Sequence, residues 1–325
     1  MKVLVTGGAG FLGSHLTDAF LDRGDEVFVL DDGPSTKIQH RLGHERFHFV
    51  QDSILDETIL ESLIARVDLV YHYAAVVGVQ HYVVDPYKVL NVNVNGTQNV
   101  LKLAYKHERR VVFASTSEVY GRNPKVPWRE EDDRVLGPTS IDRWCYATSK
   151  ATGEHFCFAF AKLGLPVTIL RYFNVYGPRL DGMGVGRVVT IFLSQAFRNK
   201  PLTVVGDGSQ TRCFTYESDA IAATVAAGLV PEAVGGVFNI GCDSEVSVRT
   251  LAERIVRISG STSPIVSVAP ETVYGSSYED IPRRVPDIQR MRDILGVTPK
   301  VELDEGLRRT IEYFWNEEEE RAGRR

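Results

Sequence analysis

Tyr146 and Lys150 are the residues whose types and spacing most directly suggest chemistry. Residues four apart on a helix lie on one face, one turn from each other. A phenol is a weak base because its reference pKa is about 10, and lowering that pKa by about three units requires roughly 4 kcal/mol of preference for the phenolate. An ammonium group about 4 Å away supplies energy of that order at an effective dielectric constant near 20. The spacing therefore predicts a phenol that serves as a base, although alone it is more often an exposed helix pair.

A glycine-rich turn near the start of the chain predicts what this base would work beside. Residues 2–6 form a β-branched-rich run, and Gly7, Gly10 and Gly13 follow it, ahead of a helical pattern that reaches residue 23. In a strand, turn and helix of this kind, the first two glycines let the backbone approach a pyrophosphate at the helix N-terminus, and the third lets the helix pack closely on the strand. We therefore predict a dinucleotide site here.

Acidic and hydroxyl side chains follow the next two predicted strands. Asp31, at the first of these strand ends, can accept hydrogen bonds from both adenosine ribose hydroxyls of NAD and would repel the extra phosphate of NADP. Asp32 stands before a Gly-Pro turn, and a turn residue explains it better. Asp52 and Ser53 follow the second strand, at the end where open parallel sheets bind ligands.

Three hydroxyls and a carboxylate end the strand predicted at residues 111–115, in the order Ser115, Thr116, Ser117 and Glu118. A hydroxyl at this position can hold the substrate oxygen whose proton Tyr146 takes, and Glu118 is placed to act as acid or base. Hydrogen bonding within a turn is a serious competing explanation for Ser115 or Thr116 taken singly.

Composition narrows the class of protein. The chain has 325 residues, 43% of them hydrophobic, so it can bury a large core as one big domain or two unequal ones. A net charge of −5 argues against nucleic-acid binding. The four cysteines lack C-x-x-C spacing and the histidines are not clustered, so we expect no metal site and no disulfide framework. No run approaches the length of a membrane span and the N-terminal apolar run is too short for a signal peptide, so we expect a soluble cytoplasmic protein.

Six motifs occur along the chain in a fixed order. They are T-G-G-A-G-F-L-G at 6–13, S-T-S-E-V-Y-G at 115–121, Y-A-T-S-K at 146–150, R-Y-F-N-V-Y-G-P at 171–178, G-D-G-S-Q-T-R-C-F-T-Y at 206–216 and F-N-I-G at 238–241. Together they resemble the extended short-chain dehydrogenase/reductase family, the NAD-dependent nucleotide-sugar epimerases, dehydratases and decarboxylases. The resemblance covers nearly the whole chain.

This resemblance implies an α/β fold, a doubly wound parallel sheet (Rossmann) with a smaller C-terminal α/β substrate domain. Residues 1–174 plus about 213–258 would form the NAD-binding domain, and about 175–212 plus 259–325 the nucleotide-sugar-binding domain. It further implies NAD as the cofactor, a nucleotide sugar, most simply UDP-linked, as the substrate, and a homodimer formed through helices predicted near 85–107 and 146–163.

The resemblance also implies individual site residues. The expected catalytic residues are Tyr146, Lys150, Thr116, Ser117 and Glu118. The expected cofactor contacts are Gly7, Gly10, Phe11, Leu12, Gly13, Asp31, Asp32, Asp52, Ser53, Ala74, Ala75, Asn93, Tyr146, Lys150 and Phe173. The expected substrate contacts are Thr116, Glu118, Arg143, Asn174, Arg187, Arg212 and Arg284, with Arg212 matching an arginine that meets the nucleotide diphosphate.

Two of these assignments carry alternatives. Asn91, Asn93 and Asn95 are spaced by two and cannot share one helix face, so at most one or two point inward, and Asn93 is the choice for a structural or cofactor-side role. Arg187 would contact phosphate or base, or be a solvated surface residue.

Enzymes of this family can begin alike, with hydride leaving C4 of the sugar for the nicotinamide while Tyr146 takes the hydroxyl proton. The 4-keto sugar can then be reduced on its other face by an epimerase, or lose water across C5–C6 in a dehydratase. If C6 is a carboxylate, the intermediate is a β-keto acid and can lose carbon dioxide.

Three local features favour the last outcome. Residues 116–118 match the pattern of UDP-glucuronate decarboxylases, and Arg143-Trp144-x-Tyr146 is similar to the decarboxylase domain of aminoarabinose synthesis and to UDP-apiose/UDP-xylose synthase. Residues 274–280, followed by Arg284, resemble a segment of the same group. Arg284 would hold a hexuronate carboxylate bidentately, or alternatively a diphosphate.

Decarboxylation of UDP-glucuronate to a UDP-pentose is therefore the favoured reaction, with 4-epimerisation of UDP-glucose or UDP-glucuronate as the alternative and 4,6-dehydration third. Ring contraction to apiose is disfavoured because Val77 and Ser117 stand where the relatives that catalyse it carry cysteines. From another class, a non-catalytic NAD(H)-binding regulator is possible on the same fold. The intact Tyr146, Lys150 and Thr116 argue against it.

Overall fold

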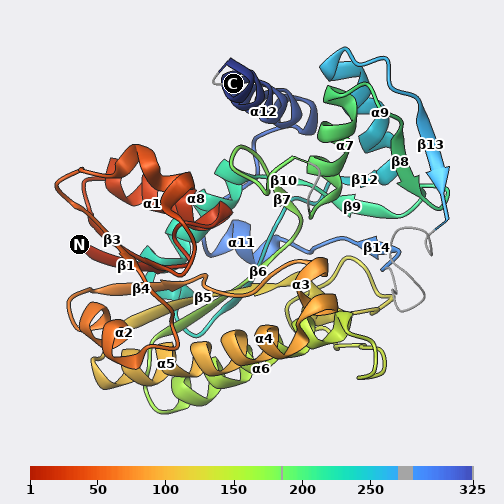
Figure 1. The fold of residues 1–325 in the computed structure, drawn as a ribbon. Coiled ribbons are helices and arrows are strands. Elements are labelled where there is room, and N and C mark those ends of the chain that lie inside the picture. Colours follow the sequence, from red (N-terminus) through yellow and green to blue (C-terminus); the bar gives the residue numbers. More distant parts are fainter. Residues whose placement is uncertain (184–185, 270–280, 324–325) are drawn as a thin grey trace.

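A seven-stranded parallel sheet forms the centre of the molecule (Figure 1). The computed structural model describes residues 1–183, 186–269 and 281–323. The strand order is β11-β6-β5-β4-β1-β2-β3, so the chain winds outward in both directions from β1 and confirms the predicted doubly wound fold. Its strands are β1 (Lys2–Thr6), β2 (Glu26–Asp31), β3 (Phe47–Gln51), β4 (Leu69–His72), β5 (Arg110–Thr116), β6 (Val167–Tyr172) and β11 (Val237–Ile240).

Helices cover both faces of this sheet, which is why its strands are apolar almost throughout. On one face α1 (Phe11–Asp22) packs beside α8 (Glu217–Leu229), against residues such as Val3 and Val5. On the other face lie α2 (Glu57–Ile64), α5 (Thr97–Lys106) and α6 (Arg143–Lys162), against residues such as Leu4 and Phe113. The carboxyl ends of the strands are left for the polar residues that follow them.

The helix expected over residues 85–107 is present as a continuous helical stretch from Pro86 to Lys106 that contains a π-helical turn. The structure has α3 (Val79–Val84), α4 (Pro86–Leu90), a π-helical turn η2 (Asn91–Gly96) and then α5. Within that turn Asn93 is buried, whereas Asn95 donates a hydrogen bond to Asn91 at the surface, at 2.7 Å. The prediction that the three asparagines cannot share a face is therefore confirmed. A π-helical turn of this kind often marks a functional site, because it turns one side chain inward.

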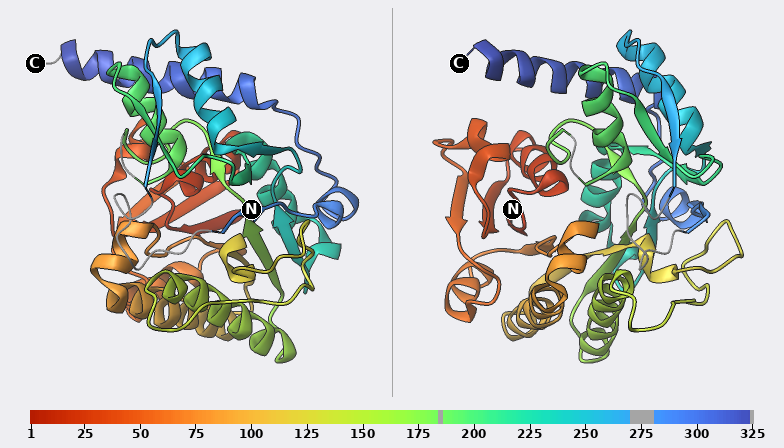
Figure 2. Two further views of the ribbon diagram at one scale, coloured as in Figure 1. Left: turned by 90° about the vertical axis from the view of Figure 1, so that its right-hand side faces the viewer. Right: turned by 45° about the vertical axis from the view of Figure 1, so that its right-hand side comes forward.

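A smaller lobe lies at one end of the molecule, with the C-terminal helix along its outer side in both views of Figure 2. It contains two short sheets with the strand orders β12-β9-β14 and β13-β8. A further pair of parallel strands, β10-β7, forms a separate two-stranded sheet. Its elements are β7 (Val175–Tyr176), α7 (Val188–Phe197), β8 (Leu202–Val205), β9 (Thr211–Cys213), β10 (Thr215–Tyr216), β12 (Glu245–Ser247), α9 (Val248–Ser259), β13 (Ile265–Val268), β14 (Arg283–Arg284), α11 (Gln289–Asp293) and α12 (Leu303–Gly323). The remaining short helical turns are η1 (Ser35–Arg41), η3 (Ser117–Tyr120) and η4 (Pro231–Ala233).

The division into two domains stays a prediction, and one boundary can be proposed more closely. Helix α9, which the expected division gave to the larger domain, packs against α7 and α12. The last large-sheet strand, β11, ends at Ile240. We therefore propose that the second segment of the NAD-binding domain ends soon after β11 and before α9.

Two further features bear on the class of protein. Among the described residues, no helix is long and apolar enough to cross a membrane. In the same part of the chain, histidine, cysteine and acidic side chains form no group that could hold a metal ion, and the four cysteines are free thiols.

Candidate active site

A cleft of about 720 Å³ opens at the carboxyl ends of the sheet strands and continues between the sheet and the smaller lobe. It brings together residues from the glycine turn, the ends of the five strands β2 to β6, α6, β9 and β14. The predicted site residues that line it are Gly7, Gly10, Phe11, Leu12, Gly13, Asp31, Asp32, Asp52, Ser53, Ala74, Ala75, Thr116, Ser117, Glu118, Tyr146, Lys150, Asn174, Arg187, Arg212 and Arg284. Arg143 lies directly behind this lining, where it contacts Glu118.

The glycine turn is shaped to receive an anion. Gly7 has φ of 73°, and a Cβ on Gly13 would lie 2.2 Å from the Gly7 carbonyl oxygen, so both positions require glycine. Helix α1 begins at Gly10 without a side-chain cap and without an acidic residue in its first turn. Its first N–H groups and the positive end of its dipole therefore face the cleft, as a pyrophosphate requires.

Asp31 closes the other side of this half of the cleft. Its carboxylate accepts hydrogen bonds from the backbone N–H of Ala9 and of Gly33, each at 2.9 Å, so its position is fixed at the end of β2. Burial raises the pKa of Asp31, and these two N–H groups oppose that rise. Lys37, which the sequence analysis missed, also lines the cleft nearby, and burial lowers the pKa of its ammonium group. Lys37 lies on η1 and belongs to none of the sequence motifs, so no motif could have identified it.

Tyr146 and Lys150 both line the cleft from one face of α6, as their spacing predicted. Burial and the negative charge of Glu118 raise the pKa of the Tyr146 phenol, whereas Arg187 and hydrogen bonding by Thr116 lower it. The Lys150 ammonium group donates to the Ala114 carbonyl at 2.8 Å. Lys150 is not among the groups named here as shifting the phenol pKa, so the expectation that it lowers this pKa stays a prediction.

The Lys150 side chain has a second property that the spacing did not predict. It is buried, and burial lowers its pKa to about 8. Its nitrogen lies 5.0 Å from the centre of the Phe113 ring. A cation held at this depth, against a carbonyl and a ring face, is oriented toward ligands in the cleft rather than toward water.

Behind the site, a buried ion pair fixes the ends of β5 and β6. Arg171 donates to both carboxylate oxygens of Glu154, at 2.9 and 2.7 Å, and Ser115 donates to the same carboxylate. Arg171 also donates to the Tyr120 hydroxyl at 2.8 Å. The Ser115 hydroxyl is therefore committed to structure, through Glu154 of α6 and not through a turn. The turn hydrogen bond is made by Thr116, whose Oγ1 accepts from the Glu118 N–H at 3.2 Å, and the same hydroxyl faces the Tyr146 phenol.

Glu118 lies among three arginines. Its carboxylate is 2.9 Å from Arg284 Nη1 and 3.3 Å from Arg143 Nη2, and Arg212 adds a further positive charge. Burial by itself would raise the pKa of Glu118, but these cations lower it to about 2. A carboxyl group with this pKa carries no proton near neutral pH. Of the two roles expected for Glu118, the structure therefore disfavours the acid and leaves the base, and the three arginines give a surplus of positive charge around this carboxylate.

Arg284 still has an unused donor. Its guanidinium is buried, and its Nε has no hydrogen-bond partner among the residues that the structure describes. Arg212, beside it on β9, donates to the carbonyls of Thr211 and Pro282, at 2.7 and 3.3 Å. A buried donor without a partner is costly, so its presence at the wall of a cleft points to an anionic ligand.

Two predicted cofactor contacts lie elsewhere. Asn93 is buried behind the cleft, where its amide pairs with both backbone groups of Val76 and donates to Ser149 at 3.1 Å, which supports the structural alternative. Phe173 lies one residue beyond the end of β6, packs against both Tyr120 and Trp128 and does not line the cleft, so its cofactor role stays a prediction that the geometry does not support. Its neighbour Tyr172 lines the cleft instead. The predicted segment 274–280 lies outside the described residues.

The fold and this site together define a class of protein, a dinucleotide-dependent enzyme with a second, cation-rich pocket for an anionic substrate. Comparison with known proteins makes this specific. The model of the NAD dependent epimerase/dehydratase family matches residues 3–241. The chain belongs to this family, as its motifs predicted, and NAD is its cofactor.

Three relatives illustrate where the chain stands in the family. It is 41% identical over 317 residues to UDP-N-acetyl-alpha-D-glucosaminuronate decarboxylase of Bacillus cytotoxicus, covering 96% of this chain and 97% of the relative. It is 38% identical to UDP-glucuronic acid decarboxylase 1 of Xenopus tropicalis, covering 99% and 74%. Among solved structures, UDP-glucuronic acid 4-epimerase from Bacillus cereus superimposes with a TM-score of 0.84 at 34% identity, covering 97% and 99%.

Proposed function

We propose that this protein decarboxylates a UDP-hexuronate, most simply UDP-glucuronate, to a UDP-pentose through a 4-keto intermediate. The observation that carries the proposal is the cluster of Arg284, Arg143 and Arg212 around the single carboxylate of Glu118. A cleft wall with more buried cations than anions is suited to a substrate that brings a carboxylate. The names of the Bacillus and Xenopus relatives, both decarboxylases of UDP-hexuronates, support the same substrate class.

The cofactor half of the cleft has a defined task. When bound, NAD accepts a hydride from C4 of the sugar and can return it. The N–H groups at the start of α1, with Gly7 and Gly13 clearing the approach, would bind the pyrophosphate. Asp31 would accept hydrogen bonds from the adenosine ribose, and Lys150 is placed to donate to hydroxyls deeper in the cleft.

In the sugar half, proton transfer falls to Tyr146. Thr116 would hold the C4 hydroxyl, and the phenolate of Tyr146 would take its proton as C4 is oxidised. Arg187, which lowers the pKa of the Tyr146 phenol, already favours that phenolate. In the resulting β-keto acid, the C5–C6 bond breaks, carbon dioxide leaves, and its electron pair moves to the C4 oxygen as an enolate. Tyr146 can return its proton to that oxygen, and as the ketone reforms this proton goes back to Tyr146 while C5 takes another proton. Return of the hydride to C4, with the Tyr146 proton to its oxygen, would then give the pentose.

Arg284 and Glu118 would act on the carboxylate. A guanidinium fork orients a carboxylate in one plane, which sets the angle of the bond that breaks. Because Glu118 is ionised and shares Arg284, the substrate carboxylate would be held without full neutralisation, so its loss as neutral carbon dioxide is not opposed. Ser117, buried next to Glu118, completes this wall.

A second candidate, 4-epimerisation of UDP-glucuronate, is supported by the likeness to the Bacillus cereus 4-epimerase. Epimerisation begins with the same oxidation at C4. It differs in that the 4-keto uronate keeps its carboxylate, turns in the site and is reduced on its other face. Dehydration across C5–C6 is the third candidate.

A single assay separates these candidates. Purified protein is incubated with NAD and UDP-glucuronate, and products are identified by chromatography and by carbon dioxide release, with UDP-N-acetylglucosaminuronate tested in parallel. A UDP-pentose with one equivalent of carbon dioxide is the expected result. UDP-galacturonate without carbon dioxide would replace the proposal by epimerisation, and no turnover of either sugar would favour a binding regulator.

We further propose that the enzyme is a cytoplasmic homodimer that does not bind nucleic acid. Tyr105 on α5 and Phe158 on α6 are each more than 40% exposed, which is consistent with a homodimer formed through these helices. Light scattering after gel filtration would report a mass twice that of one chain. The net charge of −5 is consistent with a cytoplasmic protein that does not bind nucleic acid.

A further inference from the structure

Arg284 lies on a strand that cannot hold its own position. Strand β14 has two residues, Arg283 and Arg284, and pairs with β9 on one side only. Before it, the Pro282 carbonyl accepts a hydrogen bond from the Thr211 N–H at 2.9 Å. Two residues of pairing give too few hydrogen bonds to fix a side chain, so the chain after Arg284 must be anchored as well.

That second anchor is the backbone of Trp128. The Trp128 N–H donates to the Val285 carbonyl and the Asp287 N–H donates to the Trp128 carbonyl, both at 2.8 Å. The segment 285–287 is thereby paired with a loop that has no strand of its own among the described residues. Something must in turn hold Trp128 in place.

Asn239, in the F-N-I-G motif of β11, makes that connection. Its side chain is fully buried, and its Nδ2 donates both to the Trp128 carbonyl at 2.9 Å and to the Asp287 carbonyl at 3.1 Å. Its Oδ1 accepts from the Tyr120 hydroxyl at 2.7 Å, and its backbone N–H donates to Glu130 at 2.8 Å. One amide therefore joins the central sheet to both sides of the anchor.

The same amide also reaches the partner of Arg284. Tyr120 ends η3, the short turn that carries Glu118. Asn239 is thus hydrogen-bonded to Tyr120, two residues after Glu118, and to Asp287, three residues after Arg284. The side chains of Glu118 and Arg284 themselves lie 2.9 Å apart. A rigid strand in the sheet is better suited to fix such a pair than either of the two loops.

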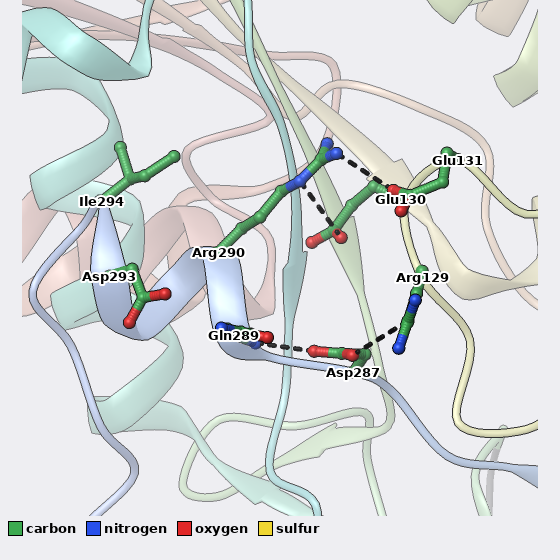
Figure 3. A pocket seen from close by; sticks show the side chains of 8 residues that line it. All are labelled: Arg129, Glu130, Glu131, Asp287, Gln289, Arg290, Asp293 and Ile294. Atoms are coloured by element: carbon green, nitrogen blue, oxygen red, sulfur yellow. Dashed lines mark hydrogen bonds and ion pairs between the residues drawn. The ribbon is translucent and has the colours of Figure 1, made fainter.

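The ion pairs on the solvent side of residues 285–287 contribute little to holding this segment in place. Figure 3 shows a surface pocket of about 400 Å³ where Arg290 pairs with Glu131 and Glu130, and Arg129 pairs with Asp287. These pairs measure 3.0, 3.7 and 3.5 Å, and Arg129 and Arg290 are 66% and 44% exposed. Exposed ion pairs of this kind stabilise weakly and are screened by salt. Inside the fold, the Trp128 indole N–H donates to the Asn123 carbonyl at 2.9 Å and helps to fix the loop, whereas Asn239 is the buried side chain that bonds to both the loop and the 285–287 segment.

We infer that Asn239 is the positioning residue that sets Arg284 against Glu118 and so determines how the site recognises a substrate carboxylate. This inference rests on the proposed function for its ligand, but its structural part is independent of it. Asn239 itself is not among the residues that line the cleft, so its effect must pass through Arg284.

The structural part is tested by hydrogen exchange of the backbone amides in residues 283–288, measured by mass spectrometry. Asn239→Leu should accelerate exchange there at least tenfold, because both carbonyls lose their donor. Asn239→Ser, a milder change that cannot reach both carbonyls, should act in the same direction if the leucine variant does not fold. Unchanged exchange in whichever variant folds would overturn the inference.

A matched control is Thr168→Val. Thr168 is fully buried on β6 and donates to the Ala233 carbonyl at 2.9 Å, at the end of the strand opposite the cleft. The Thr168→Val substitution also removes a buried hydrogen bond from a side chain to a backbone carbonyl. It should lower the midpoint of thermal unfolding, yet leave hydrogen exchange in residues 283–288 unchanged. Equal acceleration in this control would reduce the role of Asn239 to general stability and overturn the inference.

The recognition part is tested by binding, in a Tyr146→Phe background that does not start the oxidation. Asn239→Leu should weaken UDP-glucuronate about tenfold and UDP-xylose, which lacks the carboxylate, less than twofold. Combined with Arg284→Gln it should add little, because both changes act through one side chain. Equal weakening of both ligands, or full additivity, would overturn the inference. If the Tyr146→Phe protein itself does not prefer UDP-glucuronate, the proposed function fails, and hydrogen exchange still decides the positioning role.

Discussion

Replacement of Arg284 by glutamine should remove recognition of a substrate carboxylate while leaving recognition of UDP in place. The guanidinium is 10% exposed, and it is 2.9 Å from Glu118 with its Nε unpaired among the described residues. Each hydrogen bond between charged groups contributes about 1.5–3 kcal/mol. Two such bonds to a carboxylate, reduced by the competition of Glu118, give a loss of about 3 kcal/mol, which corresponds to roughly a hundredfold in kcat/KM.

The cost in stability should be smaller than for an ordinary buried ion pair. Removing one partner of such a pair costs about 3–5 kcal/mol when the remaining charge is left alone. Here Arg143 still lies 3.3 Å from Glu118, and Arg212 still acts on it. We therefore expect a loss of about 1–2 kcal/mol, measured by denaturant unfolding, so that the variant can be assayed folded.

The neighbouring Arg283 provides the control. It pairs with Glu245 at 2.8 Å on the exposed side of β14 and does not line the cleft. Arg283→Gln should change kcat/KM for UDP-glucuronate less than twofold. The assay compares both variants in turnover of UDP-glucuronate and in binding of UDP alone. If Arg284→Gln weakens UDP as much as UDP-glucuronate, Arg284 meets the diphosphate and the carboxylate argument is refuted.

Three further predictions concern the base, the cofactor turn and the anion. Tyr146→Phe should lower turnover at least about a hundredfold, because it removes the group that takes the proton. A rate near that of the wild type would show that Tyr146 does not transfer the proton. Gly13→Ala would place a Cβ 2.2 Å from the Gly7 carbonyl oxygen, so NAD affinity measured by fluorescence should fall more than tenfold, whereas Gly182→Ala, which meets nothing within 4 Å, should not change it. The pKa of Glu118 is lowered from 4.5 to about 2, so its ionised form adds about 3 kcal/mol of stability above pH 4.5 that is lost as the pH falls to about 2. The difference in unfolding free energy between wild type and Glu118→Gln should shrink by that amount between pH 6 and pH 2, and a constant difference would contradict the buried cluster.

Much of the site was predictable because its parts are set by local chain geometry. A strand, a glycine turn and a helix in succession place Gly7 and Gly13 at a pyrophosphate site whatever surrounds them. Asp31, Asp52 and Thr116 follow parallel strands, whose carboxyl ends meet at one edge of a sheet. The spacing of Tyr146 and Lys150 places both on one helix face. Each of these inferences needs only a few consecutive residues, and the structure puts all of them in one cleft.

Other features of the site were decided by the tertiary structure alone. Residues 118, 143, 212 and 284 come from four separate elements, and only their packing decides that Glu118, expected as acid or base, is ionised. Packing, a property of the whole fold, directs Lys150 to a carbonyl and places the Phe173 ring against Trp128, away from the cleft lining. In the sequence, Asn239 is only one position of the F-N-I-G motif. In the structure its side chain bonds to Trp128 and to Asp287, each more than 40 residues away along the chain. Electrostatic and hydrogen-bonding partners of this kind are set by distance in space, which no spacing along the chain records.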